Sequence, residues 1–202
     1  ITVSAISGDT SENGAQASFT VVLTSEPFSD VTVNFDSNDS GEGTTEVTSL
    51  TFTPDNWNAP QTVIVTGVDD VIADGDETTK IVVAVTGGDA AYTGVDEADV
   101  ALVAAQEFLV TTTDNDAAGF TLSGHPVTVE EGSDATFSVV LTSKPVSSVV
   151  LSVSVVDTGD GVEAGVDLTE LTFDDEHPWN TAQTVTVTGV DDLIPIADGD
   201  ES

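Results

Sequence analysis

The sequence contains no cysteine and no methionine, and only two of its 202 residues are lysine or arginine. Without cysteine the fold has no disulfide bonds and no thiolate ligands for a metal. Against the two cations stand 37 Asp and Glu residues, which give a formal net charge of −35 at pH 7. Nucleic-acid binders need Lys and Arg to displace counterions from phosphate, and anionic membrane surfaces repel so acidic a chain. The composition therefore excludes both kinds of partner.

Long apolar runs are also absent. No stretch of 18 apolar residues occurs, so we expect no membrane insertion. The first residues show no basic region followed by an apolar core, so we expect any secretion signal to lie outside this segment. Hydrophobic residues nevertheless make up 39% of the chain, whereas disordered acidic segments are poor in them. The chain is expected to fold, and bound cations are the obvious explanation for so much acid.

Two parts of the chain repeat one module. Phe19–Pro27 returns as Phe137–Pro145, Trp57–Asp70 as Trp179–Asp192, and Ala73–Glu77 as Ala197–Glu201. The spacing between equivalent residues grows along the chain, so the second copy carries small insertions. We expect one domain over 1–116, with an acidic linker at its end, and a second over 117–202. The second copy stops after its acidic loop, so its last strands are expected from a continuation of the chain or from a neighbouring molecule.

Apolar and polar residues alternate with a period of two, as in Phe19, Val21 and Leu23. Such alternation places one side of a strand on a core and the other in water. Gly, Pro, Asp and Asn clusters separate these runs at a spacing typical of β-sandwiches. The pattern predicts an all-β chain of two tandem immunoglobulin-like antiparallel β-sandwiches with Greek-key connections, the second lacking its last strands.

The predicted strands of copy one lie near 1–5, 16–24, 30–36, 47–53, 61–67, 79–86 and 98–112. Those of copy two lie near 119–129, 134–142, 147–155, 168–173 and 183–190. The stretch Ala101–Leu109 also has helical propensity, but it lies where a final strand is needed.

Carboxylates concentrate in loops instead of along the strands. Glu12 lies in a turn, and Asp39 follows the third strand. An acidic loop follows the fifth strand, and the linker closes the first domain; together they contribute Asp69, Asp70, Asp74, Asp76, Glu77, Asp114 and Asp116. Alternate loops of an antiparallel sandwich emerge at the same end, so the loops that hold Asp39, Asp70 to Glu77, and Asp114 to Asp116 are expected to converge at one pole.

Converging carboxylates repel and raise one another's pKa, and a hard divalent cation with oxygen ligands removes the conflict. Calcium suits such a site because it accepts six to eight oxygens in irregular geometry, whereas magnesium demands a tighter octahedron. Zinc would need His or Cys, and the only histidines are His125 and His177, one in each copy. We therefore expect Ca²⁺ as the bound ion.

One arrangement of these residues resembles a known family. An acid before a glycine-containing turn is followed by Phe-x-Val-x-Leu, then Asp-Asp-x-x-x-Asp-x-Asp-Glu, then Asp114-Asn115-Asp116. This order resembles the Calx-beta domain, an immunoglobulin-like sandwich found in sodium–calcium exchangers and in tandem arrays of large bacterial surface adhesins. The resemblance covers all of copy one and the first five strands of copy two.

The resemblance implies a calcium-binding pole in each copy. The residues it implies are Glu12, Asp39, Asp70, Asp74, Glu77, Asp114 and Asp116 in copy one, and Glu130, Asp157 or Asp160, Asp192, Asp198 and Glu201 in copy two. Asn115 stands where exchanger domains have a third acid. The resemblance therefore implies that this chain has one ligand fewer, or one ion fewer, than those domains. An insertion, Ile194-Pro195, also lengthens the second acidic loop.

We expect no catalytic activity. Cysteine is absent, and neither histidine lies in a pattern that pairs a base with a nucleophile. The expected function is a calcium-binding structural repeat of an extracellular, cell-surface bacterial adhesion or fibre protein, in which calcium stiffens the junction between domains. Expected partners are neighbouring repeats of the same chain or identical subunits, by strand donation. The alternative is a calcium-sensing regulatory domain of a transporter, or an accessory module of a secreted enzyme.

Overall fold

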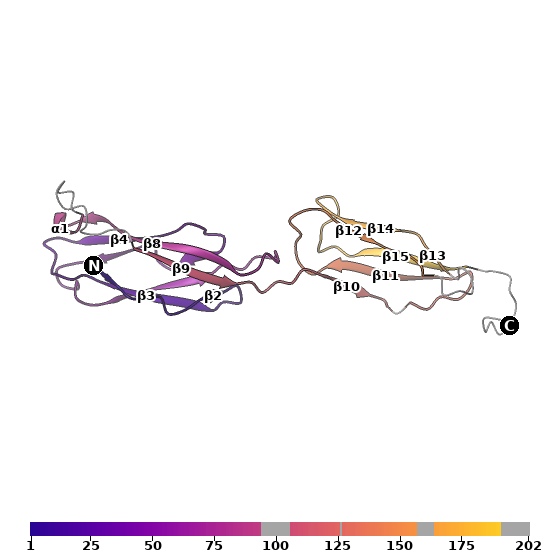
Figure 1. The fold of residues 1–202 in the computed structure, drawn as a ribbon, viewed down its shortest axis with the longest axis horizontal. Coiled ribbons are helices and arrows are strands. Elements are labelled where there is room, and N and C mark those ends of the chain that lie inside the picture. Colours follow the sequence, from indigo (N-terminus) through magenta and orange to yellow (C-terminus); the bar gives the residue numbers. More distant parts are fainter. Residues whose placement is uncertain (94–105, 126, 157–163, 191–202) are drawn as a thin grey trace. The chain divides into compact units, whose positions relative to one another are not determined.

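The computed structural model describes residues 1–93, 106–125, 127–156 and 164–190 (Figure 1). The chain forms two compact units. Unit 1 comprises Ile1–Asp70 and Asp74–Asn115, and unit 2 comprises Val71–Ala73 and Asp116–Ser202. No helix in the described ranges has both the length and the apolar character needed to cross a membrane.

Unit 1 is a sandwich of two β-sheets. The first sheet has the order β1 (Thr2–Val3), β3 (Gln16–Val22), β7 (Gln61–Gly67), β5 (Gly43–Thr45). The second has the order β2 (Thr10–Ser11), β9 (Gln106–Thr113), β8 (Glu77–Gly88), β4 (Val31–Ser37), β6 (Ser49–Phe52). A short helix, α1 (Ala90–Thr93), follows β8. Strand β2 pairs in parallel with β9, and the other pairs of unit 1 are antiparallel.

The alternating pattern of the strands builds the core of unit 1. In β3, Ala17, Phe19 and Val21 are buried, while the residues between them are partly exposed. The Phe19 ring stacks on Phe108 of β9 with centroids 5.3 Å apart. It also meets Phe35 of β4 edge to face at 5.7 Å. Each such buried side chain contributes about 1.5–3 kcal/mol to folding, so these contacts hold the two sheets together.

Unit 2 repeats this plan with fewer described strands. One sheet has the order β10 (Phe120–Ser123), β11 (Asp134–Leu141), β15 (Gln183–Gly189), β13 (Ala164–Val166), and the other pairs β12 (Val149–Ser152) with β14 (Glu170–Phe173). The amide of Leu141 donates to the carbonyl of Trp179 at 3.1 Å, as the amide of Leu23 does to that of Trp57. The six strands match β1, β3, β7, β5, β4 and β6. Strands equivalent to β8 and β9 do not occur among the described residues of unit 2.

The prediction of an all-β chain of immunoglobulin-like sandwiches is confirmed. Some boundaries differ from the prediction. The strand predicted near 168–173 is β14, and the unpredicted β13 precedes it, just as the unpredicted β5 precedes the strand predicted near 47–53, which is β6. Strands β2, β5 and β13 have two or three residues each, too few to show a period of two. The first eight residues of the strand predicted near 98–112 lie outside the described residues, and the rest form most of β9.

Candidate metal centre

Strand pairing gathers the acidic loops of unit 1 at one pole of its sandwich. Glu77 at the start of β8 pairs with Thr112 near the end of β9. Gly67 at the end of β7 pairs with Gly43 at the start of β5. The loop between β7 and β8 and the linker after β9 therefore emerge beside each other. The turn after β2 joins them because β2 runs parallel to the end of β9.

One carboxylate cluster consists of Glu12, Asp114 and Asp116. Each contributes an oxygen, and the three oxygens lie within 4.8 Å of one another. Glu12 is only 8% exposed. Its amide donates to the carbonyl of Thr113 at 3.1 Å, and its Oε2 accepts from the amide of Asn115 at 3.1 Å. The turn after β2 thus holds the backbone of the linker that carries the two aspartates.

A second cluster consists of Glu42, Asp70 and Asp74, whose oxygens also lie within 4.8 Å of one another. The pKa of Glu42 is raised, first by burial and then by the carboxylates of Asp74, Asp39, Asp70 and Glu12. Burial is the main cause, and the neighbouring carboxylates add to it because their negative charge disfavours a further one on Glu42. The contribution from Glu12 shows that the two clusters influence each other electrostatically.

The acidic loop and the linker hold each other through hydrogen bonds. The amide of Gly75 donates to Asp114 Oδ2 at 2.7 Å, and the amide of Asp114 donates to Asp76 Oδ1 at 3.2 Å. Asn115 Nδ2 donates to Asp69 Oδ1 at 2.9 Å. Gly75 has φ +89°, a conformation that glycine adopts without steric cost. Asp69 and Asp76 therefore act in this structure as acceptors that position the linker.

Two further predicted ligands lie outside both clusters. Asp39 is exposed; its Oδ1 accepts from the amide of Gly41 at 3.0 Å and its carbonyl accepts from the amide of Gly43 at 3.1 Å. The negative charge of Asp39 still affects the second cluster, because it contributes to the raised pKa of Glu42. Glu77 is the exposed first residue of β8.

Sequence reasoning missed Glu42. Its carbonyl accepts from the amide of Val68 at 3.0 Å and from the Thr112 hydroxyl at 2.9 Å, so it lies beside the end of β7. The sequence pattern predicts a loop around Glu42, whereas β5 begins at Gly43 and pairs with β7. The available signal was an acid between two glycines, Gly41 and Gly43, in the loop that carries Asp39.

In unit 2 the structure describes only one of the predicted ligands. Glu130 is exposed, and its carbonyl accepts from the amide of Ser133 at 3.0 Å. The other predicted ligands lie outside the described residues: Asp157, Asp160, Asp192, Asp198 and Glu201.

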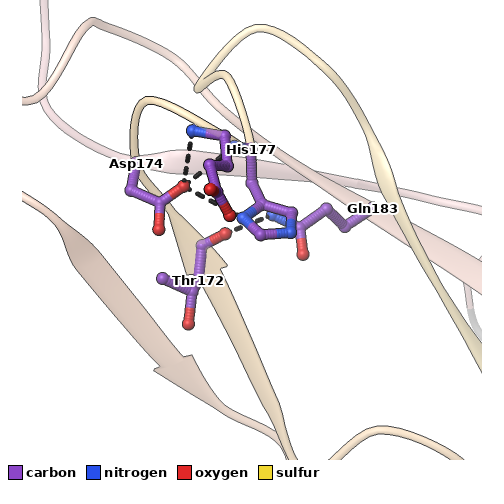
Figure 2. Close-up of polar contacts among 5 residues, drawn as sticks. Thr172, Asp174, His177 and Gln183 are labelled. Atoms are coloured by element: carbon purple, nitrogen blue, oxygen red, sulfur yellow. Dashed lines mark hydrogen bonds and ion pairs between the residues drawn. The ribbon is translucent and has the colours of Figure 1, made fainter.

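The loop between β14 and β15 holds a different polar arrangement (Figure 2). Asp174 Oδ1 lies 2.9 Å from His177 Nδ1 and accepts from the amides of His177 at 2.8 Å and Glu176 at 3.0 Å. These bonds, led by the amide of His177, lower the pKa of Asp174. Nearby, Gln183 Nε2 donates to the carbonyl of Thr172 at 2.7 Å. His177 therefore closes a turn here, and its partner carboxylate already has several donors.

The donor set of the two clusters fits calcium. Calcium–oxygen distances are about 2.3–2.6 Å, so oxygens around one calcium ion can be up to about 5 Å apart. The oxygens in each cluster meet this limit. Magnesium needs oxygens at about 2.0–2.1 Å in a near-ideal octahedron, and zinc prefers nitrogen or sulfur ligands. A set of carboxylate oxygens without nitrogen or sulfur ligands therefore suits calcium, which accepts oxygens in irregular geometry.

Comparisons with known proteins add a general likeness. No protein-family model matches the chain, and no curated protein matches it significantly. Among solved structures it is similar to the calcium binding domain CBD12 of CALX1.1, at 15% identity and a TM-score of 0.36, covering 94% of this chain and 71% of that chain. It is also similar to the D0-D1 domain of intimin, at 14% identity and a TM-score of 0.32, covering 95% of this chain and 93% of that one.

A third similar structure is SSP-19, an MSP-domain protein like family member of Caenorhabditis elegans. It is 13% identical, with a TM-score of 0.33, and the match covers 55% of this chain and 98% of that chain. Likenesses at these scores say nothing about the function of this chain. The fold of the chain is that of immunoglobulin-like β-sandwiches in tandem.

Proposed function

We propose that this chain is a calcium-binding structural module of an extracellular surface or fibre protein, in which calcium stiffens the linker after the first sandwich. The observation that supports it most is the pair of carboxylate clusters formed by the turn after β2, the residue just before β5, the acidic loop and the linker. The linker itself supplies two of the six carboxylates, Asp114 and Asp116.

The charge balance supports a bound cation. The chain has only two basic side chains, Lys80 and Lys144, against six clustered carboxylates at this pole. Lys80 Nζ forms its ion pair with Glu107 at 3.4 Å on the outer face of β8 and β9. The two basic side chains of the chain cannot neutralise six carboxylates, whereas one divalent ion in each cluster would offset four of the six negative charges.

Calcium at these clusters would be held by Glu12, Asp114 and Asp116 in one and by Glu42, Asp70 and Asp74 in the other. It would supply positive charge and connect loops that otherwise repel. Within a Debye length of about 8 Å at physiological salt, such repulsion is only partly screened. In the absence of calcium the turn after β2, the acidic loop and the linker should therefore loosen together.

The expected affinity follows from the proposed location. Calcium-binding modules that work outside cells have dissociation constants of about 0.1–1 mM, because extracellular calcium keeps such sites filled. A spacer module needs no tighter binding. Micromolar affinity would instead favour the alternative, a calcium sensor.

Calorimetric titration of calcium into the whole chain tests the proposal. Asp114→Asn removes one ligand charge while keeping the size of the side chain, and we expect it to weaken binding about tenfold, which corresponds to about 1.4 kcal/mol. Asp55→Asn is the matched control, because Asp55 is an exposed acid in the turn after β6 and belongs to neither cluster. Absence of binding heat, or equal affinity of Asp114→Asn and the control, would refute the proposal.

A further inference from the structure

Three polar groups inside unit 1 connect the segments that carry its two carboxylate clusters. They are the hydroxyls of Thr10 and Thr112 and the backbone carbonyl of Glu42, and we call them the polar layer. Thr10 and Thr112 are each 2% exposed. Thr112 continues the inward face of β9 beyond Val110, which belongs to the hydrophobic core. Buried hydroxyls cost free energy unless they form hydrogen bonds, so both need partners inside the fold.

The hydrogen bonds of the polar layer run in one direction. The Thr112 hydroxyl lies 2.9 Å from the carbonyl oxygen of Glu42, and Thr112 donates because a carbonyl can only accept. A hydroxyl has one hydrogen, so Thr10 is the donor where its hydroxyl lies 2.9 Å from that of Thr112. The carbonyl of Thr111, another acceptor near Thr10, lies farther away at 3.4 Å. The order is therefore Thr10 to Thr112 to Glu42, in which each bond polarises the next.

On one side the polar layer holds the two segments of the first cluster. Strands β2 and β9 pair in parallel, with Thr10 opposite Thr112. Two residues after each threonine comes an acid of that cluster, Glu12 in one segment and Asp114 in the other. The bond between the two hydroxyls therefore holds the two segments together just before their ligands.

On the other side the polar layer reaches the second cluster. Glu42 is a member of that cluster, and its carbonyl accepts both from Thr112 and, at 3.0 Å, from the amide of Val68. Val68 precedes Asp70, another member, by two residues. One carbonyl thus joins a segment of the first cluster to two segments of the second.

Thr79 of β8 is a buried threonine that lacks such bonds. It is 1% exposed, and a Cβ added to Gly43 would lie 3.3 Å from its hydroxyl oxygen, so it lies at the same end of the core. That oxygen has no hydrogen-bond partner among the described residues. Burial of a threonine near the clusters is therefore not what distinguishes Thr112; its two hydrogen bonds are.

We propose that Thr112 is a positioning residue shared by both carboxylate clusters, with Thr10 as the donor that supports it. The inference rests on the proposed function, because positioning affects calcium only if the clusters bind it. Without the Thr112 hydroxyl, the backbone of Glu42 loses its bond to β9, and the segments of the two clusters can move relative to each other. Both clusters then lose affinity together, although Thr112 supplies no carboxylate.

Three variants test this role by calorimetric titration of the whole chain with calcium. Thr112→Val removes the hydroxyl and keeps the branched shape, and the loss of its hydrogen bonds is expected to weaken binding about fivefold. Thr112→Ser keeps the hydroxyl and should restore binding to within about twofold of wild type. Thr79→Val is the matched control: its affinity should equal that of wild type, because the described part of the chain offers the Thr79 hydroxyl no partner.

Hydrogen exchange in chelator tests the positioning without calcium. The amides of Asn115 and Val68 each donate to a glutamate of one cluster. Both should exchange at least about fivefold faster in Thr112→Val than in wild type, because their segments open locally. The amide of Leu23 donates to Trp57, before the start of β7, whereas Val68 follows the end of that strand. The exchange rate of the Leu23 amide should therefore stay close to that of wild type.

Three results would overturn the proposal. The first is equal calcium affinity of Thr112→Val and Thr79→Val, and the second is equal exchange of the Asn115 and Val68 amides in these two variants. The third is an equal acceleration of the Leu23 amide in Thr112→Val, which would reduce the role of Thr112 to general stability.

Failure of the proposed function gives a different result. Wild type then shows no heat of calcium binding, while exchange in chelator still separates Thr112→Val from Thr79→Val.

Discussion

The amide of Asn115 donates a hydrogen bond of 3.1 Å to the carboxylate of Glu12, 103 positions earlier in the sequence. A second hydrogen bond joins the same two segments: the amide of Glu12 donates to the carbonyl of Thr113. A nearly buried acid thus holds the backbone of the linker and, with Asp114 and Asp116, forms a carboxylate cluster. One residue therefore couples the fold of unit 1, the position of the linker and the candidate metal centre.

Glu12→Gln separates these roles. The amide oxygen of glutamine can still accept from Asn115, so the backbone contact should persist while one negative charge is lost. In chelator the variant should melt at or above the wild-type temperature, because repulsion falls. In calcium its gain in melting temperature should be smaller, since affinity drops about tenfold. A lower melting temperature in chelator would instead show that Glu12 acts mainly through its hydrogen bonds.

Glu42 gives the calcium-free protein a predictable pH dependence. Its pKa is raised above the ordinary value of 4.5, so its protonated form favours the folded state. That contribution is complete below the unfolded pKa and is lost as pH rises through the folded pKa. As pH rises from the unfolded pKa of Glu42 to its folded pKa, the stability of the wild type in chelator should therefore fall relative to that of Glu42→Gln. Thermal melts of both proteins at a series of pH values measure the difference, and parallel curves would contradict the assignment.

The pH dependence of stability that Asp89 contributes should have the opposite sign to that of Glu42. Its carboxylate accepts from the amides of Ala91 and Phe28, and these bonds, led by that of Ala91, lower its pKa below 3.8. Its contribution to stability is present above the unfolded pKa and is lost as pH falls through the folded pKa. Asp89→Ala leaves the amides without this acceptor, and should lower the melting temperature near neutral pH by several degrees. No pH-dependent difference from wild type in acid would contradict this reading.

Gly67 tests whether the strands position the metal centre. A Cβ at this position would lie 2.7 Å from Thr112 Cγ2 and 2.8 Å from the carbonyl oxygen of Ser11. Gly67→Ala should therefore cost about 1–3 kcal/mol of stability by overpacking and displace the turn that carries Glu12. Calcium affinity should fall with it. Gly8→Ala is the control, because nothing lies within 4 Å of its added Cβ. Equal stability of the two variants would contradict the close packing.

The sequence predicted the long strands well because burial alone decides them. Phe19 and Val21 lie two positions apart in β3, as Ile81 and Val83 do in β8, and all four lie in the core. The same reasoning predicted that the acidic loops converge, since antiparallel pairing fixes which loops share an end. The structure brings Asp70 and Asp74 together in one cluster, and Glu12 and Asp114 in the other.

The sequence did not predict features that depend on short pairings. Strand β5 has three residues, yet its pairing with β7 is what brings Glu42 beside the acidic loop. Nor does the spacing of the acids show that Asp69 and Asp76 accept hydrogen bonds from the linker. Such contacts depend on backbone geometry at single positions. The sequence alone does not distinguish a loop carboxylate that accepts hydrogen bonds from one that can hold a metal ion.

The central claim is that calcium binds the carboxylates at the pole of unit 1 and stabilises the fold there. Thermal unfolding of the whole chain in about 10 mM calcium and in chelator, with equal magnesium as the ionic-strength control, tests it most directly. With a dissociation constant of about 0.1 mM, binding adds about 2.7 kcal/mol, enough to raise the melting temperature of unit 1 by several degrees. Coincident unfolding curves in calcium, magnesium and chelator would contradict the account.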